Sequence, residues 1–206
     1  MDAANYLAGV ILEKLITGKV LWLVPGGSAM QVAVKAAKII SGVGHADLAV
    51  TLTDERFGTP GHADSNWHQL LKLGFKLKNA RLLPVLTGAD IAKTTKKFNT
   101  MLGEELAGAD YKIGLFGIGA DSHTAGILPE SAALDSRDWA VSYKTGKFER
   151  ITITPETIKK LDEAVVYAQG PEKEKAIENL NKDLDPRKYP AQLLKEAKRL
   201  KIFHEN

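Results

Sequence analysis

The sequence contains no cysteine among its 206 residues, which excludes disulfide bonds, thiolate nucleophiles and zinc sites with cysteine ligands. It also has no apolar run that approaches the roughly 18 residues needed to span a membrane. Residues 1–18 show no basic leader followed by an apolar stretch and a small-residue cleavage site, so no signal peptide is expected. These absences predict a cytoplasmic protein that has no contact with membranes.

The sequence also lacks a large excess of either positive or negative charge. The formal net charge is only +3, and basic residues alternate with acidic ones, as in residues 171–175. A nucleic-acid-binding face needs a basic patch supported by aromatic residues or a motif, and the sequence shows neither. We therefore expect no nucleic-acid partner. A small anionic ligand suits the few available cations better, bound by a monomer or a small homo-oligomer.

Short apolar runs alternate with helical patterns along the chain. Strands are expected at 20–24, 48–52, 82–86, 113–116 and 164–168, with a strand pair at 139–143 and 150–154 around a turn at 144–147. Helices are expected around 7–15 and at 28–40, 65–73, 90–106, 171–180 and 190–200. This alternation predicts one α/β domain over residues 1–206, with a mostly parallel, twisted, Rossmann-like sheet and helices on both faces. Ligands of such sheets bind beyond the carboxyl ends of the strands, so the segments after each strand are the informative ones.

The first of these segments is Gly26-Gly27-Ser28. Two glycines allow a tight turn, and the free N–H groups of the following helix can bind phosphate together with the Ser28 hydroxyl. The alternative is a capping box between Ser28 and Gln31, with the glycines serving only the turn.

The second segment, Asp54-Glu55-Arg56, places three charges directly after a buried strand. Such charges cannot lie unpaired in the core, so we expect them at the cleft mouth. Arg56 could bind an oxyanion or a phosphate, and Asp54 could orient a group or accept a proton. The alternative is a solvated loop with a surface salt bridge. Helix capping is the default explanation for Asp64-Ser65-Asn66 downstream.

The third segment, residues 117–126, is rich in glycine and carries His123 two residues after Asp121. Histidine titrates near neutrality, so His123 is the natural base for activating water. No second histidine lies at metal-ligand spacing from this pair, and a metal site is not expected.

Two isolated cations complete the candidate set. Lys173 lies in the first turn of a helix, where a cation opposes the helix dipole unless an anion binds there. Arg150 opens a predicted strand. For each residue the alternative is an exposed side chain with ordinary surface partners.

Taken together and in this order, these segments resemble the glucosamine-6-phosphate isomerase/6-phosphogluconolactonase family over about residues 20–175. The resemblance also uses Arg150-Ile151-Thr152-Ile153-Thr154 and Gly170-Pro171-Glu172-Lys173. Lactonases of the family typically carry Arg after Asp-Glu and His-Thr-Ala in the glycine-rich turn, whereas isomerase/deaminases carry Tyr and His-Ile-Ala. Arg56 and His123-Thr124-Ala125 therefore place the chain closer to the lactonase branch.

The resemblance implies hydrolysis of 6-phosphogluconolactone in the pentose phosphate pathway, without a metal or an organic cofactor. The implied catalytic residues are His123, Asp121, Asp54 and Arg56. The implied phosphate ligands are Gly26, Gly27, Ser28, Lys173 and Arg150. Either Asp54 or Asp121 could hold the His123 tautomer.

Two alternatives stay open: an isomerase/deaminase acting on an amino-sugar phosphate, and a sugar-phosphate-binding domain without catalysis. The chain departs from the family at Ser122, where glycine is usual. A positive φ at this position would cost a serine about 1 kcal/mol or more.

Overall fold

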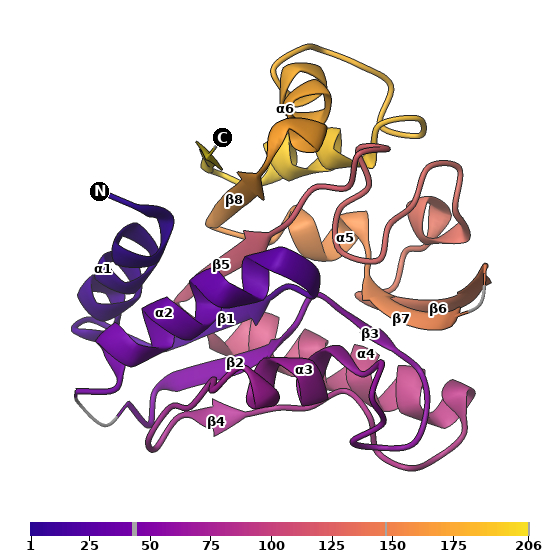
Figure 1. The fold of residues 1–206 in the computed structure, drawn as a ribbon. Coiled ribbons are helices and arrows are strands. Elements are labelled where there is room, and N and C mark those ends of the chain that lie inside the picture. The colour runs from indigo at the N-terminus through magenta and orange to yellow at the C-terminus, as the bar shows by residue number, and fades with distance from the viewer. Residues whose placement is uncertain (43–44, 147, 206) are drawn as a thin grey trace.

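Six parallel strands form the central sheet of the computed structural model, which describes residues 1–42, 45–146 and 148–205 (Figure 1). Their order is β4-β2-β1-β5-β8-β9, and each neighbouring pair is parallel. The strands are β1 Val20–Val24, β2 Leu48–Leu52, β4 Arg81–Leu82, β5 Tyr111–Phe116, β8 Glu163–Gln169 and β9 Leu200–Glu205. Every residue of β1 and β2 is buried, as expected for central strands that are covered on both faces.

Helices cover the sheet on both sides. In Figure 1, α2 crosses in front of β1, and α4 lies behind the sheet. The α-helices are α1 Ala3–Leu15, α2 Met30–Ile40, α3 Asn66–Lys72, α4 Ile91–Gly108, α5 Pro155–Ile158 and α6 Glu174–Leu180. Short 3₁₀ turns are η1 Gly27–Ala29, η2 Ala132–Asp135, η3 Pro171–Lys173 and η4 Pro190–Glu196. Among the helices described, none combines the length and apolar character needed to cross a membrane.

A second, antiparallel sheet stands beside the carboxyl ends of the central strands (Figure 1). It consists of β3 Asp54–Arg56, β7 Phe148–Ile153 and β6 Ala140–Thr145, in the order β3-β7-β6. Arg56 lies directly opposite Arg150, and Asp54 lies opposite Thr152. Because opposite and alternate residues of a sheet share a face, these four side chains project from the same side.

The predicted α/β fold is confirmed, and several element boundaries are corrected. The strand expected at 82–86 is wrong beyond Leu82, because Pro84 has no N–H to continue the ladder. The expected turn at 144–147 is too long, since β6 runs to Thr145; Lys147 lies outside the described residues. The triplet 54–56, expected as charged residues after a strand, itself forms the short strand β3.

The C-terminal part differs most from expectation. Residues 171–180 begin as 3₁₀ turn η3 and become α-helical only from Glu174. The helix expected at 190–200 is a 3₁₀ turn that ends at Glu196. The chain then forms strand β9 on the free edge of β8, and these backbone hydrogen bonds prevail over the helix-forming composition of the segment.

The strand order explains why distant turns meet. The chain leaves β1 towards β2 on one side and leaves β5 towards β8 on the other, so the order reverses between the adjacent strands β1 and β5. Crevices open at such a switch point, beyond the carboxyl ends of the strands. The turn at 25–28 follows β1 and the loop at 117–126 follows β5, so both border one crevice. We propose that residues 1–206 form a single domain, because the buried apolar side chains belong to one cluster.

Candidate active site

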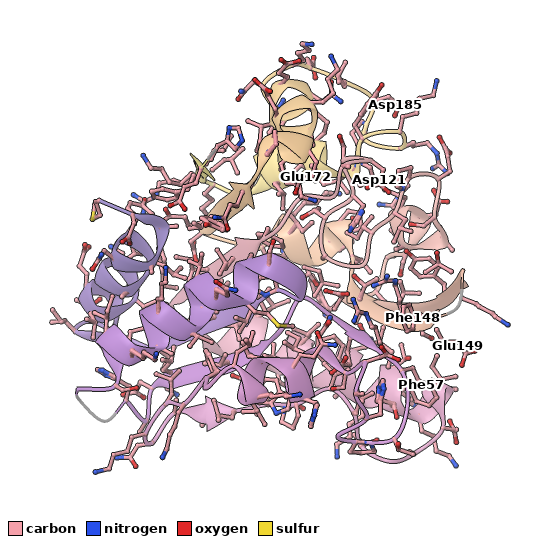
Figure 2. The ribbon with its side chains drawn as sticks, in the orientation of Figure 1. Phe57, Asp121, Phe148, Glu149, Glu172 and Asp185 are labelled. Atoms are coloured by element: carbon pink, nitrogen blue, oxygen red, sulfur yellow. The ribbon has the colours of Figure 1, made fainter. Side chains whose placement is uncertain are left out.

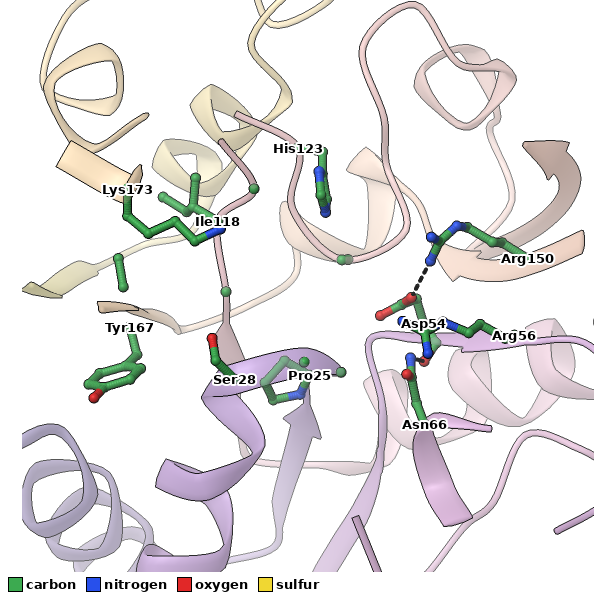
Figure 3. Close-up of a pocket in the computed structure, with 16 residues that line it drawn as sticks. Pro25, Ser28, Asp54, Arg56, Asn66, Ile118, His123, Arg150, Tyr167 and Lys173 are labelled. Carbon is green, nitrogen blue, oxygen red and sulfur yellow. Dashed lines mark hydrogen bonds and ion pairs between the residues drawn. The ribbon is translucent and has the colours of Figure 1, made fainter. Parts of the chain in front are cut away.

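A cavity of about 270 Å³ occupies this crevice (Figure 3). Every predicted site residue except Asp121 lines it, and Asp121 contacts His123. The rest of the lining consists of Pro25, Asn66, Gly117, Ile118, Gly119, Ala125, Tyr167 and Ala168. The structure therefore brings together segments more than 100 residues apart in the chain, although their individual roles stay predictions.

The turn after β1 leaves the Ser28 hydroxyl available. Gly27 has a φ of 70°, a left-handed conformation that glycine adopts without strain. The N-cap residues of η1 and α2 are Gly26 and Ala29, and neither helix start has a side-chain cap. The alternative capping box of Ser28 with Gln31 is therefore not formed. In Figure 3 the Ser28 hydroxyl points into the cavity.

The loop after β5 holds Asp121 against His123. Asp121 Oδ1 lies 2.5 Å from His123 Nδ1 and also accepts a 3.2 Å hydrogen bond from the His123 backbone N–H. A Cβ at Gly119 would overlap the imidazole ring, so only glycine permits this close approach. When Nδ1–H donates to Asp121, Nε2 keeps its lone pair for a ligand in the cavity. Of the two carboxylates considered from the sequence, Asp121 is the one that contacts the His123 ring.

The charge state of Asp121 fits this arrangement. Partial burial acts to raise the pKa of its carboxyl, but the adjacent His123 and the hydrogen bonds from it outweigh that effect and lower the pKa overall. Asp121 is therefore an anion at neutral pH. An anion at this position stabilises the imidazolium that forms when His123 accepts a proton.

Ser122 has the positive φ that was expected to strain a serine at this position. Its φ is 64°, and its side chain is buried, with a hydroxyl that has no hydrogen-bond partner in the described structure. The backbone of Ser122 is held firmly, since its carbonyl accepts a 2.8 Å hydrogen bond from the Ala191 N–H. Position 122 therefore has the geometry for which glycine is better suited.

The second sheet anchors the His123 loop through Gly126. The Gly126 N–H donates to Thr152 Oγ1 at 3.0 Å, and its carbonyl accepts from the Tyr143 hydroxyl at 2.5 Å. Thr152 lies on β7 and Tyr143 lies on β6, on the face of the sheet that also carries Arg150. The strands that position the arginines thus also fix the loop that carries the imidazole.

Asp54 is a buried carboxylate beside two guanidinium groups. Its Oδ2 lies 3.4 Å from Arg150 Nη1, and its Oδ1 accepts a 3.3 Å hydrogen bond from Thr53. Burial raises the pKa of Asp54, whereas the charges of Arg150 and Arg56 act in the opposite direction. Asp54 does not cancel the local positive charge, because Arg150 and Arg56 bring two positive charges near this single carboxylate.

Glu55 does not point into the cleft, and the expectation that all three charges of the triplet lie there is wrong. Alternation along β3 directs Glu55 away from Asp54 and Arg56. Its buried carboxylate accepts hydrogen bonds from the N–H groups of Asn66 and Trp67 and from the Ser65 hydroxyl, at 2.6–3.1 Å. Ser65 itself caps α3 by accepting from the His68 N–H. Glu55 therefore stabilises the start of α3.

Lys173 lines the cavity on the side opposite Arg56 and Arg150 (Figure 3). It is half-buried at the end of η3, and no salt bridge to its ammonium group forms among the described residues. Figure 3 shows Lys173 and Ser28 on one side of His123, with Arg150, Arg56 and Asp54 on the other side. The cavity thus has a cationic group at each end and the imidazole between them.

Asn66 is the most informative residue that the sequence interpretation missed. It follows the capping Ser65, so the local pattern suggested only a helix start. Its Nδ2 donates a 2.9 Å hydrogen bond to the Asp54 carbonyl, which ties α3 to β3 at the cavity wall. Tyr167 was also missed, and the only signal for it was its position near the carboxyl end of a predicted strand. Within residues 1–42, 45–146 and 148–205, no three acidic or histidine side chains group as metal ligands would.

Solved structures of other proteins share the fold of this chain. A 6-phosphogluconolactonase from Shewanella baltica OS155 superimposes with a TM-score of 0.83 at 21% identity, over 100% of this chain and 96% of the other. A 6-phosphogluconolactonase from Thermotoga maritima gives 0.83 at 18% identity, over 100% and 97%. A monomeric glucosamine-6-phosphate deaminase gives 0.82 at 17% identity, over 99% and 91%. At these identities the likeness shows a shared fold.

Sequence comparison gives the family directly. No curated protein matches this chain at a significant level. The family model described as "Glucosamine-6-phosphate isomerases/6-phosphogluconolactonase" matches residues 1–202, almost the whole chain. The chain therefore belongs to the glucosamine-6-phosphate isomerase/6-phosphogluconolactonase family.

Proposed function

We propose that this protein hydrolyses 6-phosphogluconolactone to 6-phosphogluconate. The observation that carries the proposal is the His123–Asp121 pair, with 2.5 Å between Nδ1 and Oδ1, on a cavity with cationic side chains at both ends. A phosphorylated lactone needs an anchor for its dianion, a base for water and a donor for the carbonyl oxygen. Family membership and the lactonase structures of the same fold support this choice of substrate.

The phosphate is anchored by Lys173 and by the turn Gly26-Gly27-Ser28. Lys173 has no anionic partner among the described residues, and the uncapped turn offers backbone N–H groups and a hydroxyl. An anion bound here would also offset the unfavourable position of a cation at a helix start. Both features support a phosphate at this end of the cavity.

His123 activates the water. Its Nε2 accepts a proton as the water oxygen attacks the lactone carbonyl carbon, and Asp121 stabilises the resulting imidazolium. The tetrahedral intermediate then collapses, and the bond between the carbonyl carbon and the ring oxygen breaks. The imidazolium returns its proton to that ring oxygen, so the products are a free carboxyl group, a hydroxyl group and a neutral imidazole.

Arg56 and Arg150 serve the ester end. Their side chains project from directly opposite positions on β3 and β7, on the far side of His123 from Lys173. Preorganised cations aimed at the carbonyl oxygen stabilise the charge that develops there. We therefore assign Arg150, which the sequence interpretation grouped with the phosphate ligands, to the carbonyl oxygen together with Arg56. Asp54, which also lines the cavity, contacts the Arg150 guanidinium at 3.4 Å.

Two substrates separate this proposal from its main alternative. The wild-type protein is expected to accelerate the disappearance of freshly prepared 6-phosphogluconolactone above the spontaneous rate and to release no ammonia from glucosamine 6-phosphate. Ammonia release without lactone hydrolysis would favour the deaminase, for which the buried Asp54 would be the base. Binding of 6-phosphogluconate without turnover of either substrate would favour a non-catalytic sugar-phosphate-binding domain. The expected cytoplasmic location and the monomeric or small oligomeric state stay predictions.

A further inference from the structure

We propose that Phe148 is a positioning residue that holds the guanidinium groups of Arg56 and Arg150 in their working orientation. This inference rests on the function proposed above, because it concerns the two arginines assigned to the carbonyl oxygen. Phe148 does not line the cavity and so acts through its neighbours. Phe148 is the first residue of β7, the central strand of the second sheet, and Figure 2 labels it there.

The sheet register brings the three side chains together. Arg56 and Arg150 are direct cross-strand partners, and Phe148 lies two residues before Arg150 on the same face of β7. Phe148 is therefore a diagonal neighbour of Arg56, within reach of a long side chain. The Arg56 guanidinium carbon lies 5.1 Å from the centre of the Phe148 ring, and that of Arg150 lies 5.7 Å away. Both distances fall within the range of cation–π interactions.

Hydrogen bonds alone hold the two guanidinium groups weakly. Arg56 Nη1 donates to the Asp64 carbonyl at 3.2 Å, and the contact of Arg150 Nη1 with Asp54 is 3.4 Å. The Nε atoms of both arginines are buried without a hydrogen-bond partner in the described structure. A guanidinium with few polar contacts takes its orientation from packing, and the ring of Phe148 is shared by both groups.

The ring also relieves an unfavourable arrangement. Like charges directly opposite each other in a sheet destabilise it, and Asp54 offers one carboxylate for two arginines. An aromatic face attracts both cations at once without neutralising them. The two arginines consequently keep a net positive charge for the substrate beside the single Asp54 carboxylate, in a fixed geometry.

Three variants test the proposal: Phe148→Leu, which removes the aromatic face, Phe148→Tyr, which keeps it, and Phe57→Leu. Phe57 is the matched control, since it is also half-buried, follows Arg56 directly and does not line the cavity. The first readout is the kcat/KM for 6-phosphogluconolactone. The second is the NMR signal of the Nε–H groups of Arg56 and Arg150, assigned by Arg→Lys substitution, which the ring current of Phe148 shifts.

The expected result is a roughly tenfold fall in kcat/KM for Phe148→Leu, mainly in kcat, together with loss of the shift at both arginines. Phe148→Tyr should keep both the kcat/KM and the arginine shifts of the wild type, and Phe57→Leu should change neither. If Phe148→Leu does not fold, Phe148→Met replaces it. Arginine Nε–H signals that are the same in Phe148→Leu and in the wild type, or equal effects of Phe57→Leu, would overturn the proposal. A wild-type protein without lactonase activity but with the expected NMR pattern would refute the proposed function and leave the positioning role intact.

Discussion

Replacing Ser122 by glycine should stabilise the protein, although the change removes a side chain from a buried site. A non-glycine residue in the left-handed region costs on the order of 1–3 kcal/mol, and Ser122 has a φ of 64°. Its buried hydroxyl lacks a partner in the described structure, which costs about 1–3 kcal/mol more. Glycine gives back about 0.5–1 kcal/mol through the greater freedom of the unfolded chain. Taken at the low end of each range, these contributions lead us to expect that Ser122→Gly raises the free energy of unfolding by about 1–2 kcal/mol.

Urea titration of the wild type and the variant measures this difference directly. For a chain of this size, about 1–2 kcal/mol corresponds to a rise in Tm of roughly 2–8 °C. Ser122→Ala separates the two contributions, because it removes the hydroxyl and keeps the strained Cβ, so it should give a smaller gain. Asn79→Gly is a control at an exposed residue with a φ of 61°, and it should change stability little because asparagine tolerates the left-handed conformation better than serine does. A Ser122→Gly protein less stable than the wild type would show that the serine is not strained.

Three further predictions concern the ionisable side chains of the cavity. Lys173→Met should raise KM for the phosphorylated lactone about 10- to 100-fold and leave kcat within a few-fold; steady-state kinetics with an unchanged KM would remove Lys173 from the phosphate site. Asp121→Asn should lower kcat about tenfold at constant KM, a modest loss because the Asp121 side chain is 52% exposed; an undiminished kcat would show that the carboxylate does not assist His123. Burial raises the pKa of Asp54 in the folded protein above its ordinary value of 3.8, so folding favours the protonated carboxyl. The stability that Asp54 contributes is therefore fully present below a pH of 3.8 and is lost as the pH rises through the folded pKa. The stability of the wild type relative to Asp54→Asn, followed by urea unfolding, should therefore fall as the pH rises from about 4, and a pH-independent difference would contradict this sign.

The features predicted well from the sequence are those set by local pattern. Two apolar runs, Val20–Val24 and Leu48–Leu52, are the strands β1 and β2 at the predicted residues, because a strand buried on both faces leaves a continuous apolar signal. The prediction that the turn at 25–28 and the loop at 117–126 border one ligand site follows from the general rule for parallel sheets. The resemblance to the family implied in addition that Lys173 and Arg150 belong to the same site.

The features that were missed depend on contacts between distant residues. Strand β9 exists because the edge of β8 is free to pair with residues 200–205, and no local pattern of the preceding helix-forming segment reveals it. Glu55 lies in the same charged triplet as Asp54 and Arg56, yet it caps α3, and only the formation of β3 separates its direction from theirs. Phe148 is an ordinary strand residue in the sequence, and only the pairing of β3 with β7 shows its contact with two arginines.

The central claim is that His123 acts as the base in a cavity that binds a phosphorylated sugar acid, and one paired measurement tests it. The rate of 6-phosphogluconolactone hydrolysis and the Kd for 6-phosphogluconate are determined for the wild type and for His123→Asn. We predict that the variant loses about 10²–10⁴-fold in kcat, down to the spontaneous background, while its Kd for 6-phosphogluconate stays within a few-fold of the wild type. Equal rates of hydrolysis by the two proteins, at equal affinity for the product, would contradict the account.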